Sequence, residues 1–333
     1  MQATRRQRMY MLRVLNRLLL FVFVASSLLS AVGVKAQCCS TGSPVGASTY
    51  VGVLNKNAIR AISFYRHSFS DIYYEGTDPS DDAVDMSDNA FYDFAGISVE
   101  YGLSHRFTLQ ADAGYFFNKV VNFHNPQLTD HNGQGMSNGT VLLKYGIYID
   151  PVKLIEISAG AGLKYPFTRQ PPTAPNGTLL HLDARPSTNA FGFTGTLLLS
   201  KEFAPLTLRT FLLSRFEYNG FNINEYQTGK LFSSSLFISK KIAKRLFGIA
   251  QLRNEVHGKD IQDGEVQNNT GYYLMVFTPQ ISYSIAGLWN FSFLYDIPVY
   301  KNYQGKQLTP QYSYAFSLTR DFSNCSFKRK SAD

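Results

Sequence analysis

Beyond residue 58, apolar residues alternate with polar or small residues in a series of similar segments. In segment 154–166, Ile155 and Ile157 occupy one set of alternate positions, and Glu156 and Lys164 occupy the other. Successive side chains of a β-strand point to opposite faces of a sheet. The alternation therefore predicts strands with one apolar face and one polar face.

Twelve segments of this kind are separated alternately by long polar loops and short turns. The expected strands lie near 59–75, 89–103, 107–117, 138–149, 154–166, 189–201, 206–218, 230–241, 246–257, 270–284, 289–300 and 310–322. The expected long loops are 76–88, 118–137, 167–188, 219–229, 258–269 and 301–309. Alternating long and short connections are typical of a membrane β-barrel, whose short turns lie in the periplasm.

The fold class that this pattern predicts is all-β: a single transmembrane up-and-down antiparallel β-barrel of about 12 strands over 58–322. Tilted strands of roughly a dozen residues are long enough to cross an apolar band of ~25 Å. The alternative is a soluble β-sandwich, but sandwich strands usually have only ~5–6 residues.

The clearest strands fix which side chains should face lipid and which the lumen. The lipid-facing set is Val141, Leu143, Tyr145, Ile147, Ile149, Trp289, Phe291, Phe293, Tyr295, Ile297, Tyr312, Tyr314, Phe316, Leu318 and Phe322. The inward set is Thr140, Leu142, Lys144, Gly146, Tyr148, Asn290, Ser292 and Asp296. Segments 59–75 and 230–241 alternate less cleanly, so their faces are not assigned.

Residues 1–36 are typical of a cleaved signal peptide, with a basic start, an apolar stretch and a small-residue cleavage site at 34–36. A retained membrane helix is the alternative, but the apolar run is shorter than the ~20 residues that span a bilayer. A lipoprotein is also possible because Cys38 and Cys39 follow closely. With an even strand count, segment 37–57 and the tail 323–333 are both expected in the periplasm.

Composition supports a membrane barrel and excludes a nucleic-acid-binding function. The chain has 26 Phe and 21 Tyr but 1 Trp and 3 Cys, and aromatic residues collect at membrane interfaces. Six of its cations lie in the signal segment, so cleavage lowers the formal net charge from +8 to about +2. No basic stripe remains, and we expect no nucleic-acid partner.

The signal segment, the alternating hairpins and the final strand ending Thr319-Arg320-Asp321-Phe322 resemble a single-chain outer-membrane β-barrel of Gram-negative bacteria. Segment 38–44 is similar to that of uncharacterised outer-membrane transporters of the porin-like class. The resemblance covers about 58–322 and implies a location in the cell outer membrane. It departs from the class because Phe322 is followed by eleven more residues.

The alternation sends charges of both signs into the expected lumen. The candidate lumen-lining residues are Glu100, Asp112, Lys144, Glu156, Lys164, Arg209, Arg215, Glu217, Arg253, Glu255 and Asp296. We expect Arg209, Arg215, Arg253 and Glu255 to line one stretch. Inward small residues, such as Gly96 and Gly160, are expected to clear space. A mixed lumen fits a narrow path for a small polar solute, or a lumen closed by salt bridges.

Other clusters carry weaker signals. Loop 76–88 has Asp78, Asp81, Asp82, Asp85 and Asp88, which could bind Ca²⁺ but lack EF-hand spacing, so a solvated loop is favoured. Histidines and aspartates at the loop end could form a metal site, but they lack its close spacing; they are His124, Asp130, His131, His181 and Asp183 in the expected loops and His257 at a strand end. His67 is the one histidine within an expected strand body, and no nucleophile motif accompanies it. We expect no cofactor, no metal and no enzymatic activity.

The sequence thus favours a monomeric outer-membrane channel that passes small polar solutes by diffusion and contacts outer-membrane lipid. No folded plug precedes the first expected strand, which argues against an energy-coupled receptor. The alternative is a structural or interaction barrel with a closed lumen that acts through its extracellular loops.

The three cysteines give a first prediction. The first and last strands of a closed barrel are neighbours, and the periplasm is oxidising, so we expect a disulfide from Cys38 or Cys39 to Cys325. A strained Cys38–Cys39 bridge, or a cysteine pair that holds a soft metal, are the alternatives. Peptide mapping of the non-reduced protein should recover a cross-linked Cys325 peptide, and a free Cys325 thiol would contradict the bridge.

Overall fold

The computed structural model describes residues 52–80, 87–123, 131–174, 177, 179–285 and 289–322, all within one compact unit, Lys35–Asp333. The expected signal peptide, the tail 323–333 and most of segment 37–57 lie outside the described residues. So do Cys38, Cys39, Cys325, Asp81, Asp82, Asp85, His124 and Asp130. Within the described ranges, no helix is long and apolar enough to cross a membrane.

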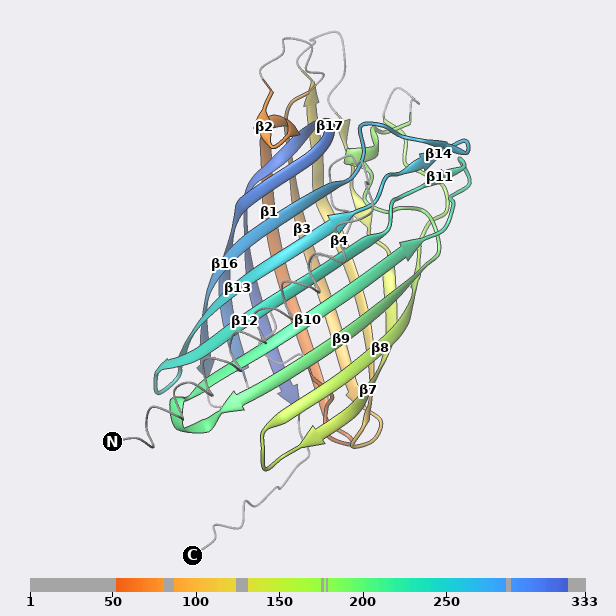
Figure 1. Ribbon diagram of the computed structural model, residues 1–333. Helices are drawn as coiled ribbons and strands as arrows, with labels where there is room; N and C mark the ends of the chain where they lie inside the picture. Colours follow the sequence, from red (N-terminus) through yellow and green to blue (C-terminus); the bar gives the residue numbers. More distant parts are fainter. Residues whose placement is uncertain are drawn as a thin grey trace, which may run out of the picture. The chain divides into compact units, whose positions relative to one another are not determined.

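Eleven long antiparallel strands form a closed wall (Figure 1). They are β1 (Ile59–Gly76), β3 (Ser87–Gly102), β4 (Phe107–Phe123), β7 (Gly139–Asp150), β8 (Ile155–Tyr165), β9 (Gly192–Phe203), β10 (Leu208–Asn219), β12 (Leu231–Ala243), β13 (Leu246–His257), β16 (Tyr272–Ile285) and β17 (Trp289–Phe322). Each pairs with the next along the chain, and β17 also pairs with β1, which closes the barrel.

The last strand, β17, crosses the wall twice. It has 34 residues, and its first arm pairs with β16 up to Tyr303 whereas its second arm pairs with β1 from Tyr303 to Phe322. Gly305 lies between the arms with a φ of 74°, a left-handed conformation that glycine adopts without strain. The two arms and the ten preceding long strands make twelve crossings, which confirms the expected fold class.

Short elements occupy several of the expected loops. They are β2 (Asp78–Pro79), β5 (His131–Asn132), β6 (Gly135–Met136), β11 (Tyr226–Gln227), β14 (Ile261–Gln262), β15 (Glu265–Val266) and the 3₁₀ turns η1 (Leu182–Ala184) and η2 (Ala204–Leu206). Two loops are shorter than expected, because β4 continues to Phe123 and β17 runs through 301–309. The loops also make buried contacts, one of which is the hydrogen bond that the Tyr226 hydroxyl donates to Asp260; burial, together with this carboxylate, raises the pKa of Tyr226.

The two faces of the wall have opposite chemistry. Leu143 has 43% of its surface exposed on the outer face, whereas its neighbour Lys144 has 6%. The same alternation holds for Phe293 and Leu294, with 38% and 4%. An outer surface of exposed Leu, Ile, Val, Phe and Tyr side chains around a charged interior is stable against hydrocarbon.

A register shift reverses the alternation at one end of β7. The shift lies between Gly146 and Tyr148, and it places Tyr148 opposite Ile157 and Ile149 opposite Glu156. Residues directly opposite each other share a face, so Tyr148 lies on the outer face and Ile149 on the inner face. The sequence predicted the reverse for both, because a bulge of one residue changes every later assignment on its strand.

Adjacent residues on β8 provide a test of the lipid-facing surface. Ile157 is opposite the outward Leu199, whereas Ser158, 4% exposed, is opposite the buried Leu198. Ile157→Arg should lower the stability of the folded barrel more than Ser158→Arg does, because it places a cation on the lipid-facing surface, which costs ~2–4 kcal/mol at the bilayer midplane and less toward the interface. Urea unfolding of both variants from liposomes measures the difference. Equal stabilities would contradict this register.

Candidate functional site

Near the short-turn end of the barrel, the lumen holds a network of four charged side chains. Lys144 Nζ donates to Glu100 Oε1 at 2.8 Å, and Arg60 Nη1 lies 3.6 Å from Glu100 Oε2. Arg60 also donates to Asp321 on β17 at 2.6 Å. These contacts link β1, β3, β7 and β17 across the interior, and Glu100 is only 3% exposed.

A second network lies on β8 and β10. Lys164 Nζ donates to Glu217 Oε2, and Arg215 Nε lies 2.7 Å from Glu217 Oε1. The side chains of Lys164 and Glu217 are each 2% exposed. Both carboxylate oxygens of Glu217 therefore face a cation, so this buried charge is compensated.

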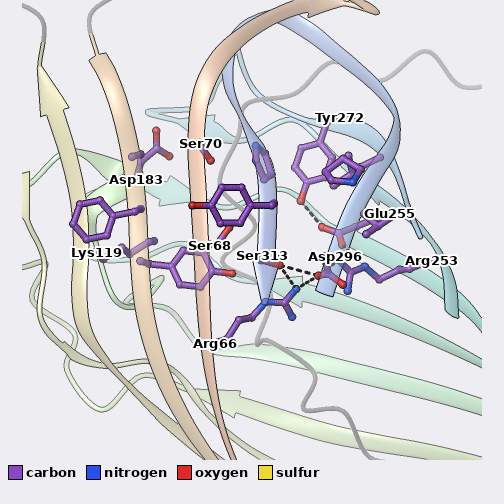
Figure 2. A pocket seen from close by; sticks show the side chains of 18 of the residues that line it. Arg66, Ser68, Ser70, Lys119, Asp183, Arg253, Glu255, Tyr272, Asp296 and Ser313 are labelled. Atoms are coloured by element: carbon purple, nitrogen blue, oxygen red, sulfur yellow. Dashed lines mark hydrogen bonds and ion pairs between the residues drawn. The ribbon is translucent and has the colours of Figure 1, made fainter. Parts of the chain in front are cut away.

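The third network is centred on Asp296, on the first arm of β17 (Figure 2). Asp296 Oδ2 accepts hydrogen bonds from Arg66, from Ser313 at 2.9 Å and from Arg253 at 3.3 Å. Asp296 Oδ1 accepts from the Thr278 hydroxyl at 2.5 Å.

The same network continues toward the long loops through Glu255. Arg253 Nε lies 3.5 Å from Glu255 Oε2, and the Tyr272 hydroxyl donates to Glu255 Oε1 at 2.5 Å. Arg253 therefore links two carboxylates: Glu255 on its own strand, β13, and Asp296 on β17.

The remaining candidate residues lie elsewhere in the interior. Asp112 accepts two hydrogen bonds from Gln110, at 2.8 and 3.0 Å. Arg209 Nε donates to the Ser200 hydroxyl at 3.1 Å, and its guanidinium lies 5.6 Å from the centre of the Phe211 ring. The structure thus pairs Arg253 with Glu255 and Arg215 with Glu217, and it places Arg209 against Ser200, nearer the short turns.

Two chambers lie within the lumen, and three residues line both of them. The turn-side chamber and the loop-side chamber share Arg66, Arg253 and Asp296. The turn-side chamber also reaches Arg215, Glu100 and Lys144. The Asp296 network therefore lies where the two chambers meet.

Aromatic side chains fill part of the lumen that small residues were expected to clear. A Cβ atom on Gly96 would lie 2.4 Å from the Phe64 ring, and one on Gly114 would lie 2.0 Å from the Phe94 ring. Phe94 packs on both Phe64 and Phe116, with ring centres 5.7 and 4.7 Å apart. The glycines provide room for inward aromatic rings, so the inner wall is amphipathic rather than wholly polar.

A short segment before β1, residues 52–57, lies inside the barrel at its short-turn end. The Val53 N–H donates to Glu156 Oε1 at 2.7 Å, and the Leu54 N–H donates to Thr108 Oγ1 at 2.7 Å. Thr108 is fully buried on β4, directly opposite Lys144 on the neighbouring strand β7. We call residues 52–57 the strap. It narrows this mouth and accounts for the position of Glu156.

Strand β1 supplies residues that the sequence did not assign. Arg66 faces the lumen and His67, next in the chain, faces outward. His67 Nδ1 lies 2.8 Å from Asp93 Oδ1, which also accepts from the Tyr65 hydroxyl at 2.6 Å, and Asn118 donates to Asp93 Oδ2 at 3.0 Å. Because both faces of β1 carry polar residues here, hydropathy alone does not give its phase.

Two of the loop histidines are close together. The His181 N–H donates to His131 Nδ1 at 2.8 Å, and His181 Nδ1 lies 3.6 Å from Asp183 Oδ2. His257 is the last residue of β13, at the strand end where it was expected, and it stacks on Tyr272 with ring centres 5.3 Å apart. Among the residues that the structure describes, no group of three His, Cys, Asp or Glu side chains is arranged to hold a metal ion.

The comparisons with known proteins concern the fold. No protein-family model matches the sequence, and no curated protein matches it. The structure is similar to that of the COG4313 outer membrane channel from Pseudomonas putida F1, with a TM-score of 0.63, 13% sequence identity, and coverage of 81% of this chain and 97% of that chain. The chain has the fold of an outer-membrane β-barrel.

Weaker similarities point to other barrels. One is the β domain of the Bordetella autotransporter BrkA, with a TM-score of 0.47, 11% sequence identity, and coverage of 80% of this chain and 100% of that chain. Another is the KdgM porin, with a TM-score of 0.42, 10% sequence identity, and coverage of 79% of this chain and 99% of that chain. At these levels of identity the comparisons assign no substrate.

The anchoring of the strap at Glu156 gives a prediction. Glu156→Ala removes the acceptor of the Val53 N–H, whereas Glu156→Gln keeps an oxygen in its place. One hydrogen bond contributes ~0.5–1.5 kcal/mol, so amide exchange at Val53 should become roughly 2- to 12-fold faster in Glu156→Ala. Mass-spectrometric hydrogen exchange measures this rate. Unchanged exchange in Glu156→Ala would show that the strap is held by other contacts.

Proposed function

We propose that the protein is a monomeric outer-membrane channel for passive diffusion of small polar solutes through a lumen of mixed charge. The observation that carries this proposal is the pair of chambers that share Arg66, Arg253 and Asp296. A solute would cross from one chamber to the other beside opposed charges, which orient a polar molecule without an energy source. The protein has no catalytic role in this proposal.

The orientation follows the usual arrangement of such barrels. The short turns and both termini face the periplasm, and the long loops face the cell exterior. The strap then lies at the periplasmic mouth, after removal of the signal peptide 1–36. Outer-membrane lipid is the partner of the outer surface, and no nucleic acid is bound.

The alternative is a structural or interaction barrel with a closed lumen that acts through its extracellular loops. Two observations favour it: the strap occupies one mouth, and the buried charges are compensated within the wall. Planar-bilayer recording of the purified full-length protein distinguishes the two functions. Stepwise conductance supports the channel, and silence from correctly folded protein supports the closed barrel.

Arg253→Ala tests whether the shared charges face permeating ions. Asp296 keeps Arg66, Thr278 and Ser313 as partners, so the carboxylate remains hydrogen-bonded. Loss of the Arg253 cation should shift the reversal potential in a salt gradient toward cation preference by several millivolts. Arg320→Ala, which removes a cation from the outer face, is the control. Unchanged selectivity with reduced thermal stability would indicate that Arg253 has only a structural role.

A further inference from the structure

Most carboxylate oxygens around the turn-side chamber already accept hydrogen bonds or face cations; the exception among the described residues is Glu100 Oε2, which accepts no hydrogen bond and lies 3.6 Å from Arg60 Nη1. Both oxygens of Asp296 accept hydrogen bonds from nearby side chains, and both oxygens of Asp112 accept from Gln110. The two oxygens of Glu217 face Lys164 and Arg215. These acidic groups neutralise the cations around the chamber, but they do not use all of the N–H groups that the cations carry.

Several donors therefore remain within the chamber. A guanidinium has five N–H groups, and Arg66 Nε and Arg215 Nη2 are buried without a hydrogen-bond partner among the described residues. The side chain of Arg66 is 7% exposed, and that of Arg215 is 13% exposed. The hydroxyl groups of Ser98, Thr140 and Thr194 are also buried without a hydrogen-bond partner among the described residues. All five residues line the turn-side chamber.

The rest of the chamber wall is apolar. Its apolar lining includes Ile62, Phe64, Phe94, Leu142, Leu198, Phe237 and Leu294. Phe64 and Phe94 pack with ring centres 5.7 Å apart. An apolar surface beside guanidinium donors matches a molecule that has an apolar part and an oxyanion, since each part then contacts groups of its own kind.

We propose that the turn-side chamber binds small organic anions that carry one carboxylate on an apolar body. The carboxylate accepts hydrogen bonds from the unused N–H groups of Arg66 and Arg215 and from the chamber hydroxyls. The apolar body packs on Phe64, Phe94 and their neighbours. This deepens the proposed function, because it names the solute class that the lumen would hold most strongly.

Saturation-transfer NMR tests the binding with the full-length protein in nanodiscs, after subtraction of empty nanodiscs. Benzoate has both features, acetate lacks the apolar body, and benzamide lacks the charge. We expect benzoate to bind at least about tenfold more tightly than either. Arg66→Gln and Arg215→Gln should each weaken benzoate binding about tenfold, the effect of losing a charge-assisted hydrogen bond.

Arg320→Gln is the matched control, because it removes the same charge from the outer face, where Arg320 lies over Trp289 and Phe322. It should leave benzoate binding within twofold. Benzamide or acetate binding as tightly as benzoate, or equal weakening by Arg320→Gln, would overturn the proposal. Conductance without benzoate binding would refute the site alone, whereas benzoate binding to a protein that does not conduct would refute only the channel.

Discussion

The pairing of β1 with β17 is the constraint on which the rest of the structure depends. In hydrocarbon no water is available for an unpaired backbone N–H or C=O, so a sheet must close on itself. The ladder that runs from Ile59 opposite Phe322 to Tyr303 opposite Gly76 achieves this. Closure also fixes the direction of every side chain, because alternate residues must face either lipid or the enclosed space.

Enclosure explains why the interior charges occur in networks. A single buried ion is costly unless its partners compensate for lost hydration. Asp296 has four such partners, which come from β1, β13, β16 and the second arm of β17. The positive and negative side chains of these networks neutralise one another, but unused N–H groups remain on the arginines. They remain because an arginine carries more N–H groups than one carboxylate can accept.

The sequence was sufficient for features that depend on short-range periodicity. The alternation around Leu143 and Lys144 predicted the faces of β7 as far as Gly146, and the spacing of hairpins predicted the closed barrel. It was insufficient where one residue changes the phase, as at Tyr148, or where both faces are polar, as around Arg66 and His67. Pairs such as Arg66 and Asp296, 230 residues apart, depend on closure and on strand tilt, which local pattern does not encode. The strap was missed for the same reason.

The outward cluster of Tyr65, His67, Asp93 and Asn118 has a consequence for the surface that the barrel presents to lipid. These groups satisfy one another's hydrogen bonds, and they interrupt the apolar outer surface of β1, β3 and β4, which resumes toward the long loops at Phe69 and Tyr312, whose stacked rings have centres 5.7 Å apart. A polar group that faces hydrocarbon is costly unless it is hydrogen-bonded, so this mutual pairing is what allows the cluster to lie in the outer wall. The cluster sets one sector of the barrel's circumference apart from the others.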